Sequence, residues 1–112
     1  MIYIVGDRPS KHNLDKNVPF IGTKSFTTLA GWIEVLQLQD YKIYNAYNEL
    51  GKANVLPENG IFIALGNNAA KALKGKVCFK LPHPSGLNRK LNDKQWLQQQ
   101  LQACKVWLKD IE

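Results

Sequence analysis

The sequence predicts an α/β protein with three layers, α/β/α, around a four-stranded, mainly parallel sheet. Short apolar runs alternate along the chain with amphipathic segments, and this strand–helix alternation is typical of parallel sheets covered by helices. The run Ile61–Leu65 is apolar throughout, as expected of a central strand that is buried on both faces. A length of 112 residues is that of one ordinary domain, so we expect a single domain over residues 1–112.

The first half of the chain is predicted to hold two strands and one helix. Residues 2–5 form an apolar run ended by Gly6, which predicts a buried strand leading into a loop. Residues 6–22 are polar and without periodicity, and a loop of this length is often functional. Residues 41–44 predict a second strand. The helix between them is predicted over residues 24–38, with an apolar face formed by Phe26, Leu29, Ala30, Ile33 and Leu36.

The middle of the chain holds the strongest strand and a short helix. Residues 45–60 are loop-like and lead into the strand Ile61–Leu65. The turn Gly66-Asn67-Asn68 then starts a helix over residues 69–74, which Gly75 closes.

The last third is predicted to form a strand, a loop and a long helix. Residues 77–81 predict the fourth strand, and the loop after it is dense in turn residues. The final helix is predicted over residues 93–111, with Asn92 as its N-cap and Gln95 completing a capping box. Its core stripe steps by four, three, four and three residues through Leu97, Leu101, Cys104, Leu108 and Ile111.

The charge balance favours an anionic partner. Fifteen Lys and Arg residues against nine Asp and Glu give a formal net charge of +6, and nucleic acid is the commonest partner of such a surface. Lysine dominates, which suits diffuse attraction to phosphates more than bidentate base readout. The two arginines, Arg8 and Arg89, stand out because both lie in segments rich in proline and glycine.

Several classes of protein are not supported by the sequence. No apolar run approaches the roughly 18 residues of a membrane span, and the N-terminus has no signal-peptide pattern. Cys78 and Cys104 have core-like neighbours, so we interpret them as small buried hydrophobes in a reducing cytoplasm. Metal signatures and phosphate-cradling glycine motifs are absent from the sequence. We therefore expect no cofactor, no metal and no membrane partner, and we expect a monomer.

Three polar segments follow predicted strands: residues 6–10, 44–48 and 81–88. Ligands of open α/β sheets bind outside the carboxyl ends of the strands. The sequence therefore predicts that these segments converge on one edge of the sheet.

Within these segments Asp7 and His83 are the candidates for chemistry. At the mouth of the first strand, the Asp7 carboxylate can orient a water or stabilise a developing cation; alternatively it closes an Asx turn on its own backbone. His83 lies between two prolines, and a neutral imidazole there can donate to a carbonyl oxygen of a ligand; alternatively it is a solvated loop histidine. Ser85 can bind a phosphate.

Asn45 and Phe20 are candidates for recognising a base. The Asn45 amide carries a donor and an acceptor and can match a nucleobase edge, although loop asparagines mostly form turns. Phe20 either packs on the core or offers its ring to a flat ligand.

Taken together, the motifs resemble the uracil-DNA glycosylase superfamily. Gly6-Asp7-Arg8-Pro9 resembles the first motif of that family, and Pro19-Phe20-Ile21-Gly22 resembles the stretch that supplies a stacking aromatic. Tyr44-Asn45 is similar to the strand end whose asparagine reads uracil. The seven residues 83–89, His-Pro-Ser-Gly-Leu-Asn-Arg, resemble the second motif and are the most specific match. The turn at residues 63–69 also fits. The resemblance extends from residue 2 to about residue 100.

The resemblance implies a glycosylase that flips a base out of DNA before cleaving its glycosidic bond. Asp7 is implied as the group that stabilises the sugar cation or positions water, and His83 as the group that stabilises the departing base. The implied substrate-binding residues are Gly6, Arg8, Phe20, which stacks on the base, and Asn45, which reads it. The implied DNA-binding residues are Ser10 and Ser85 on phosphates, Gly86, Leu87 as the wedge, and Asn88 and Arg89 on the orphan base or backbone.

The chain departs from the family pattern in its first motif. The acid is second in the motif, at Asp7, whereas members with an Asp or Asn catalyst place it third, where this chain has Arg8. The thermophilic iron–sulfur branch has Glu at the second place, but this chain lacks that branch's cluster cysteines. Two alternatives therefore stay open beside the glycosylase: a relative that only binds DNA or a base, and a relative with nuclease or modified-base chemistry.

Overall fold

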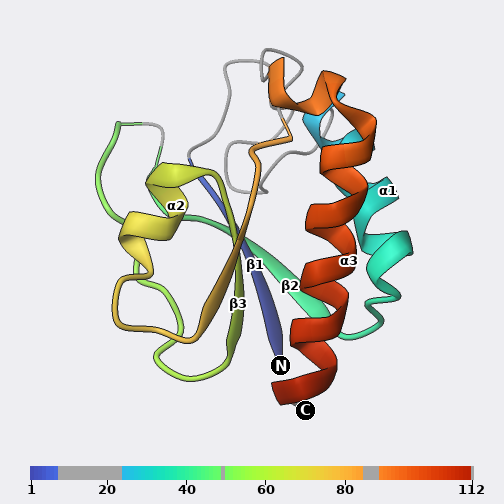
Figure 1. The fold of residues 1–112 in the computed structure, drawn as a ribbon. Coiled ribbons are helices and arrows are strands. Elements are labelled where there is room, and N and C mark those ends of the chain that lie inside the picture. Colours follow the sequence, from blue (N-terminus) through green and yellow to red (C-terminus); the bar gives the residue numbers. More distant parts are fainter. Residues whose placement is uncertain (8–23, 49, 85–88, 112) are drawn as a thin grey trace.

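The computed structural model describes residues 1–7, 24–48, 50–84 and 89–111 (Figure 1). Its four strands form one sheet in the order β2-β1-β3-β4, and every neighbouring pair is parallel. The predicted α/β class is thus confirmed, with a sheet that is parallel throughout. The strands are β1 (Ile2–Gly6), β2 (Tyr41–Asn45), β3 (Ile61–Leu65) and β4 (Cys78–Leu81).

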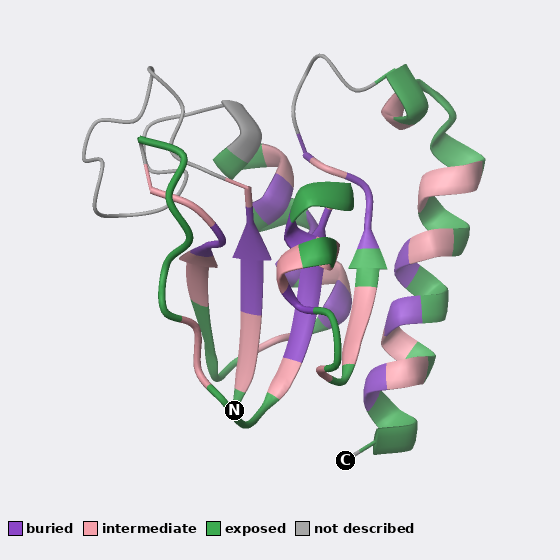
Figure 2. Cartoon of the chain, turned by 90° about the vertical axis from the view of Figure 1, so that its left-hand side faces the viewer, coloured by how far each residue is buried: buried purple, intermediate pink, exposed green. Residues whose placement is uncertain are grey.

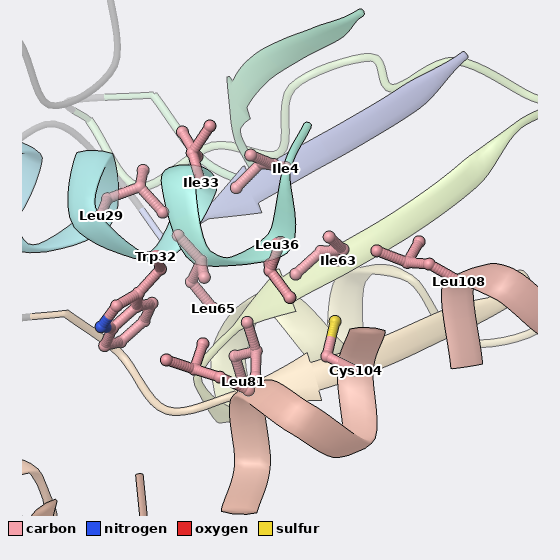
Figure 3. Packing of buried hydrophobic residues seen from close by; sticks show 11 residues of the cluster. Ile4, Leu29, Trp32, Ile33, Leu36, Ile63, Leu65, Leu81, Cys104 and Leu108 are labelled. Carbon is pink, nitrogen blue, oxygen red and sulfur yellow. The ribbon is translucent and has the colours of Figure 1, made fainter. Parts of the chain in front are cut away.

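Helices cover both faces of this sheet. α1 (Lys24–Leu36) and α3 (Lys94–Ile111) pack together on one face, and α2 (Asn67–Ala72) lies on the other (Figure 1). Strand residues alternate between the two layers. Ile4 and Ile63 pack in the cluster shared with α1 and α3 (Figure 3), whereas Val5 and Phe62 pack with α2. The architecture is therefore the predicted three-layer one.

Burial within the sheet increases toward the carboxyl ends of the strands. In β1 the first two residues are partly exposed and the last three are buried, and β2 runs from exposed Tyr41 to buried Asn45. Figure 2 shows the same gradient along β1 and β3. The polar segments therefore leave the sheet from the carboxyl ends of the strands, where the strand residues are buried in the core.

The buried face of α1 differs from the predicted face. Leu29, Ile33 and Leu36 are buried as expected, but Ala30 is exposed and Phe26 is 39% exposed. Trp32, which the apolar pattern left out, is only 5% exposed and belongs to the core cluster (Figure 3). It follows Leu29 by three residues and precedes Leu36 by four, so helical spacing places it on the same face. The buried face of α1 therefore includes Trp32 and leaves out Ala30.

α1 also ends two residues before the predicted Leu38. Gln37 has a left-handed backbone (φ 57°), and its N–H donates to the Glu34 carbonyl at 3.1 Å. The Leu38 N–H donates to the Ile33 carbonyl at 3.2 Å. These two bonds form a Schellman motif, which satisfies the last carbonyls of the helix. Glutamine rarely occupies that position, so the sequence carried no stop signal.

The cap of α3 is Asp93, and the prediction of Asn92 was wrong. The Trp96 N–H donates to Asp93 Oδ1 at 2.9 Å, which is the bond of an N-cap side chain to the third helical residue. Asn92 instead ends a short 3₁₀ helix, η1 (Arg89–Asn92). The core stripe is confirmed at Leu101, Cys104 and Leu108; Leu97 is partly buried, and Ile111 is 36% exposed.

The boundaries of α2 and β4 shift slightly from the predicted ones. α2 begins at Asn67, directly after the turn glycine, and ends at Ala72. Gly75 has the left-handed backbone expected of it (φ 87°). β4 begins at Cys78, the first residue in register with β3, and Val77 before it is 58% exposed.

Both cysteines are free thiols. Cys104 is buried in the core, and burial raises the pKa of its thiol to about 12. Cys78 on β4 is partly buried and packs against the α2 side of the sheet. The expectation of small hydrophobic residues is confirmed for Cys104, whereas Cys78 is partly open to solvent.

Candidate functional site

The four strands end at one edge of the sheet, and the described parts of the polar segments meet there. Gly6 at the end of β1 pairs with Asn45 at the end of β2, and Leu65 at the end of β3 pairs with Leu81 at the end of β4. Asp7 therefore follows one central strand, and His83 lies two residues beyond the edge strand β4. The predicted convergence is confirmed for these described positions.

Asp7 lies beside the crevice between β1 and β3. The chain leaves β1 toward α1 on one face and leaves β3 toward α2 on the other, so this is the topological switch point at which such sheets bind ligands. Asn68 Nδ2 donates to Asp7 Oδ2 at 3.0 Å and thereby joins the two sides of the crevice. The Tyr47 N–H donates to the Asp7 carbonyl at 2.8 Å, which ties its backbone to the segment after β2.

His83 is half-buried beside the same crevice. Burial lowers the pKa of His83 below its usual value of 6.5, and the smaller opposing effect is the negative charge of Asp7. The imidazole is therefore mainly neutral at neutral pH, and a neutral imidazole can donate one hydrogen bond and accept another.

Gly66 allows His83 to approach the end of β3. A Cβ built on Gly66 would lie 3.2 Å from His83 Cβ, which is tighter than ordinary side-chain contacts. The backbone of Gly66 (φ 89°, ψ 178°) lies in a region that is essentially restricted to glycine. Its N–H donates to the Leu81 carbonyl at 2.8 Å. Glycine is thus needed here for two independent reasons.

Asp7 and His83 line one pocket of about 310 Å³. That volume is at the lower end of the range of small-molecule sites, roughly 300–1,000 Å³. A carboxylate, a neutral imidazole and two amide side chains face the same space, so the pocket can bind a flat polar ligand and act on it with acid–base groups. The described lining residues are Asp7, Leu65, Gly66, Asn67, Asn68 and His83.

Asn67 and Asn68 were not predicted as site residues. The sequence identified the turn at 66–68 as a strand-to-helix step and gave its side chains no function. Two adjacent asparagines at the carboxyl end of a central strand are the signal that was available. Both residues line the pocket, and they are the first two residues of α2.

Asn45 is not among the described residues that line this pocket. It is 7% exposed at the end of β2, and β1 and β3 separate that strand from β4. Asn54 Nδ2 donates to the backbone carbonyl of Asn45 at 2.9 Å, which fixes the strand end. Its role as a base reader stays a prediction.

The other predicted site residues divide into two groups. Gly6 is buried at the end of β1, and Arg89 is exposed as the first residue of η1. The remaining predictions lie outside the described residues: Arg8, Ser10, Phe20, Ser85, Gly86, Leu87 and Asn88.

In the part of the chain that the structure describes, no three His, Cys, Asp or Glu side chains group together as metal ligands would. Among those same residues, no helix combines the length and the apolar character that a bilayer crossing requires. Comparisons of the chain with protein-family models, with curated proteins and with solved structures found no match.

Proposed function

We propose that this protein is a small DNA glycosylase that hydrolyses the N-glycosidic bond of uracil, or of a related modified pyrimidine, after the base is flipped out of DNA. The observation that carries the proposal is the placing of Asp7 and His83 in one pocket at the switch point of the sheet. A carboxylate beside a neutral imidazole supplies the two groups that this hydrolysis requires.

The reaction breaks the bond between C1′ of deoxyribose and N1 of the pyrimidine. The electron pair of that bond leaves with the base, so negative charge grows on the base and positive charge on the sugar. The neutral His83 imidazole donates to a carbonyl oxygen of the base and stabilises the first charge. The Asp7 carboxylate stabilises the second charge and orients the attacking water, whose oxygen bonds to C1′ while its proton passes on to the departing base.

The neighbours of the two groups support these roles. Asn68 holds the Asp7 carboxylate by a hydrogen bond of 3.0 Å, so the charged group has a defined orientation before substrate binds. Gly66 leaves the space in which His83 lies against the end of β3. In the resemblance on which the proposal also draws, Phe20 stacks on the base, Asn45 reads its edge and Leu87 fills the gap in the duplex.

The partner in this proposal is DNA, and the protein acts in the cytoplasm. The formal net charge of +6 favours association with phosphates through counterion release. Arg89 is exposed in η1, at the end of the second motif, and is available to a phosphate.

The test is an incubation of the purified protein with end-labelled DNA that carries one uracil, with and without alkali. A break that appears only after alkali is expected, because excision of the base leaves an abasic site. A break without alkali would contradict the proposal and indicate a nuclease. Intact DNA together with a salt-sensitive gel shift would replace it with a binding protein.

A further inference from the structure

A second pocket, of about 440 Å³, shares a wall with the first. Gly66, Asn67 and His83 line both pockets, so His83 stands between them. The second pocket extends from the end of the edge strand β4 to the start of α3. Its further lining residues include Lys80, Lys90, Trp96 and Gln100. We call it the Lys80–Trp96 groove.

Each lysine of the groove contacts an uncharged side chain. Lys80 Nζ donates to Asn67 Oδ1 at 2.6 Å, which anchors the ammonium group beside the wall that both pockets share. Lys90 Nζ lies 5.8 Å from the centroid of the Trp96 ring, within the range of a cation–π contact. The ordering of both side chains lowers the entropic cost of binding an anion between them.

The groove is positively charged and has an aromatic side. The described lining residues include two lysines and no carboxylate, since Asp7 lines only the neighbouring pocket. Trp96 is partly buried in the first turn of α3, where the Asp93 cap fixes its backbone. Gln100 lies one helical turn farther along and offers an amide with a donor and an acceptor.

We propose that the Lys80–Trp96 groove binds the nucleotide that flanks the target base in a single strand of DNA. Lys80 and Lys90 hold its phosphate, and its base lies against Trp96 and Gln100. Cationic side chains along a groove with an aromatic platform are the usual means of binding single-stranded nucleic acid. The choice of DNA as the ligand rests on the proposed function. The shared wall at His83 makes the two pockets neighbouring subsites for successive nucleotides.

The test measures binding of an end-labelled hexathymidylate, which contains no uracil, by fluorescence anisotropy at several salt concentrations. Lys80→Gln and Lys90→Gln are each expected to weaken binding several-fold. Each should also lower the slope of log affinity against log salt by about 0.7, the value for one phosphate contact on a single strand. Trp96→Ala should weaken binding by about tenfold, within the range for one base–aromatic stack. Trp96→Phe, which keeps a ring, should retain most of the affinity.

Lys109→Gln is the matched control. Lys109 is exposed in the last turn of α3, far along the helix from the groove, and its substitution removes the same charge. Its effect on affinity and salt slope should be small. Equal effects of Lys80→Gln and Lys109→Gln would overturn the proposal in favour of diffuse attraction. Binding of thymidine monophosphate as tight as that of the hexamer would overturn it in favour of a free nucleotide.

The outcome is separable from that of the proposed function. If the protein releases uracil but the groove variants bind the hexamer as the wild type does, the groove proposal is overturned and the glycosylase proposal stands. Groove-dependent binding of the hexamer in a protein that releases no uracil overturns the glycosylase alone, and the groove stands as a nucleic-acid site.

Discussion

Asn68 donates a hydrogen bond to Asp7 across the switch point of the sheet, from Nδ2 to Oδ2 at 3.0 Å. The two residues are 61 positions apart in the sequence and meet because β1 and β3 are neighbours. The bond gives the carboxylate a fixed direction beside the pocket that it shares with His83. Asn68 is therefore a positioning residue in the proposed reaction, and Asp7 is the group that acts.

Asp7→Asn should lower the rate of uracil release by at least about 100-fold, because it removes the charge that stabilises the sugar cation and orients water. Binding to uracil-containing duplex, measured by gel shift, should survive. The control is Asp110→Asn, an exposed carboxylate at the end of α3. Turnover that is unchanged in Asp7→Asn would remove this residue from the reaction.

Asn68→Ala should lower kcat by about tenfold, because a hydrogen bond to a charged group contributes about 1.5 kcal/mol or more. The value of KM should change little, since the proposed contact acts on Asp7. The control is Asn59→Ala, in an exposed loop before the amino end of β3, and its kcat and KM should match those of the wild type. A rise in KM at constant kcat would instead assign Asn68 to substrate binding.

His83 should make the stability of the fold depend on pH. Burial lowers its pKa in the folded protein below 6.5, so the unfolded chain binds the proton more readily. The resulting stabilisation is complete above pH 6.5 and is lost as the pH falls through the lowered pKa of the folded state.

The measurement is the free energy of unfolding by urea at pH values on both sides of 6.5. In His83→Gln the part of the pH dependence due to His83 should disappear. His12, the second histidine of the sequence, is the control, and His12→Gln reports its separate contribution. The same slope in His83→Gln and in the wild type would contradict the prediction.

Gly66→Ala should destabilise the protein by about 1–3 kcal/mol, the cost of placing a side chain in a backbone region restricted to glycine. The new Cβ would also press on His83 Cβ at 3.2 Å. Gly31→Ala is the opposite control, because its Cβ meets nothing within 4 Å and α1 favours alanine over glycine. The midpoint temperature of thermal unfolding should be lower than that of the wild type in Gly66→Ala and higher in Gly31→Ala. Equal stability of Gly66→Ala and the wild type would show that the turn relaxes.

The sequence was sufficient to predict the sheet, because apolar runs that are buried on both faces have few alternatives. It also placed Asp7 and His83 at one edge, since the carboxyl ends of parallel strands meet there. The Asn68–Asp7 bond could not be predicted in the same way. It depends on which strands are neighbours and on the residue at which α2 begins, and neither follows from a local pattern.

The errors at the helix ends have physical causes of their own. At Gln37 a residue without strong turn preference adopts the left-handed conformation, because the Schellman bonds and packing compensate its cost. Trp32 was overlooked because the predicted apolar face was drawn through Phe26, Ala30 and the three aliphatic positions, although an indole on the buried face covers more apolar area. Local pattern therefore predicted which elements form, and tertiary contacts determined their limits.

The cap of α3 gives the most direct test of such a boundary, because the two candidates are adjacent. Asp93 accepts the Trp96 N–H at 2.9 Å, so Asp93→Ala should lower the free energy of unfolding by about 1 kcal/mol. Asn92→Ala, one position earlier in η1, is the matched control and should change stability by only a few tenths of a kcal/mol, as is usual for exposed positions. The free energies of unfolding of both variants in urea show which of the two residues caps α3. A larger loss of unfolding free energy in Asn92→Ala would instead support Asn92 as the N-cap of the capping box that the sequence predicted. Because Asp93 also fixes the backbone of Trp96, its loss should weaken hexathymidylate binding in the Lys80–Trp96 groove, whereas Asn92→Ala should leave that binding intact.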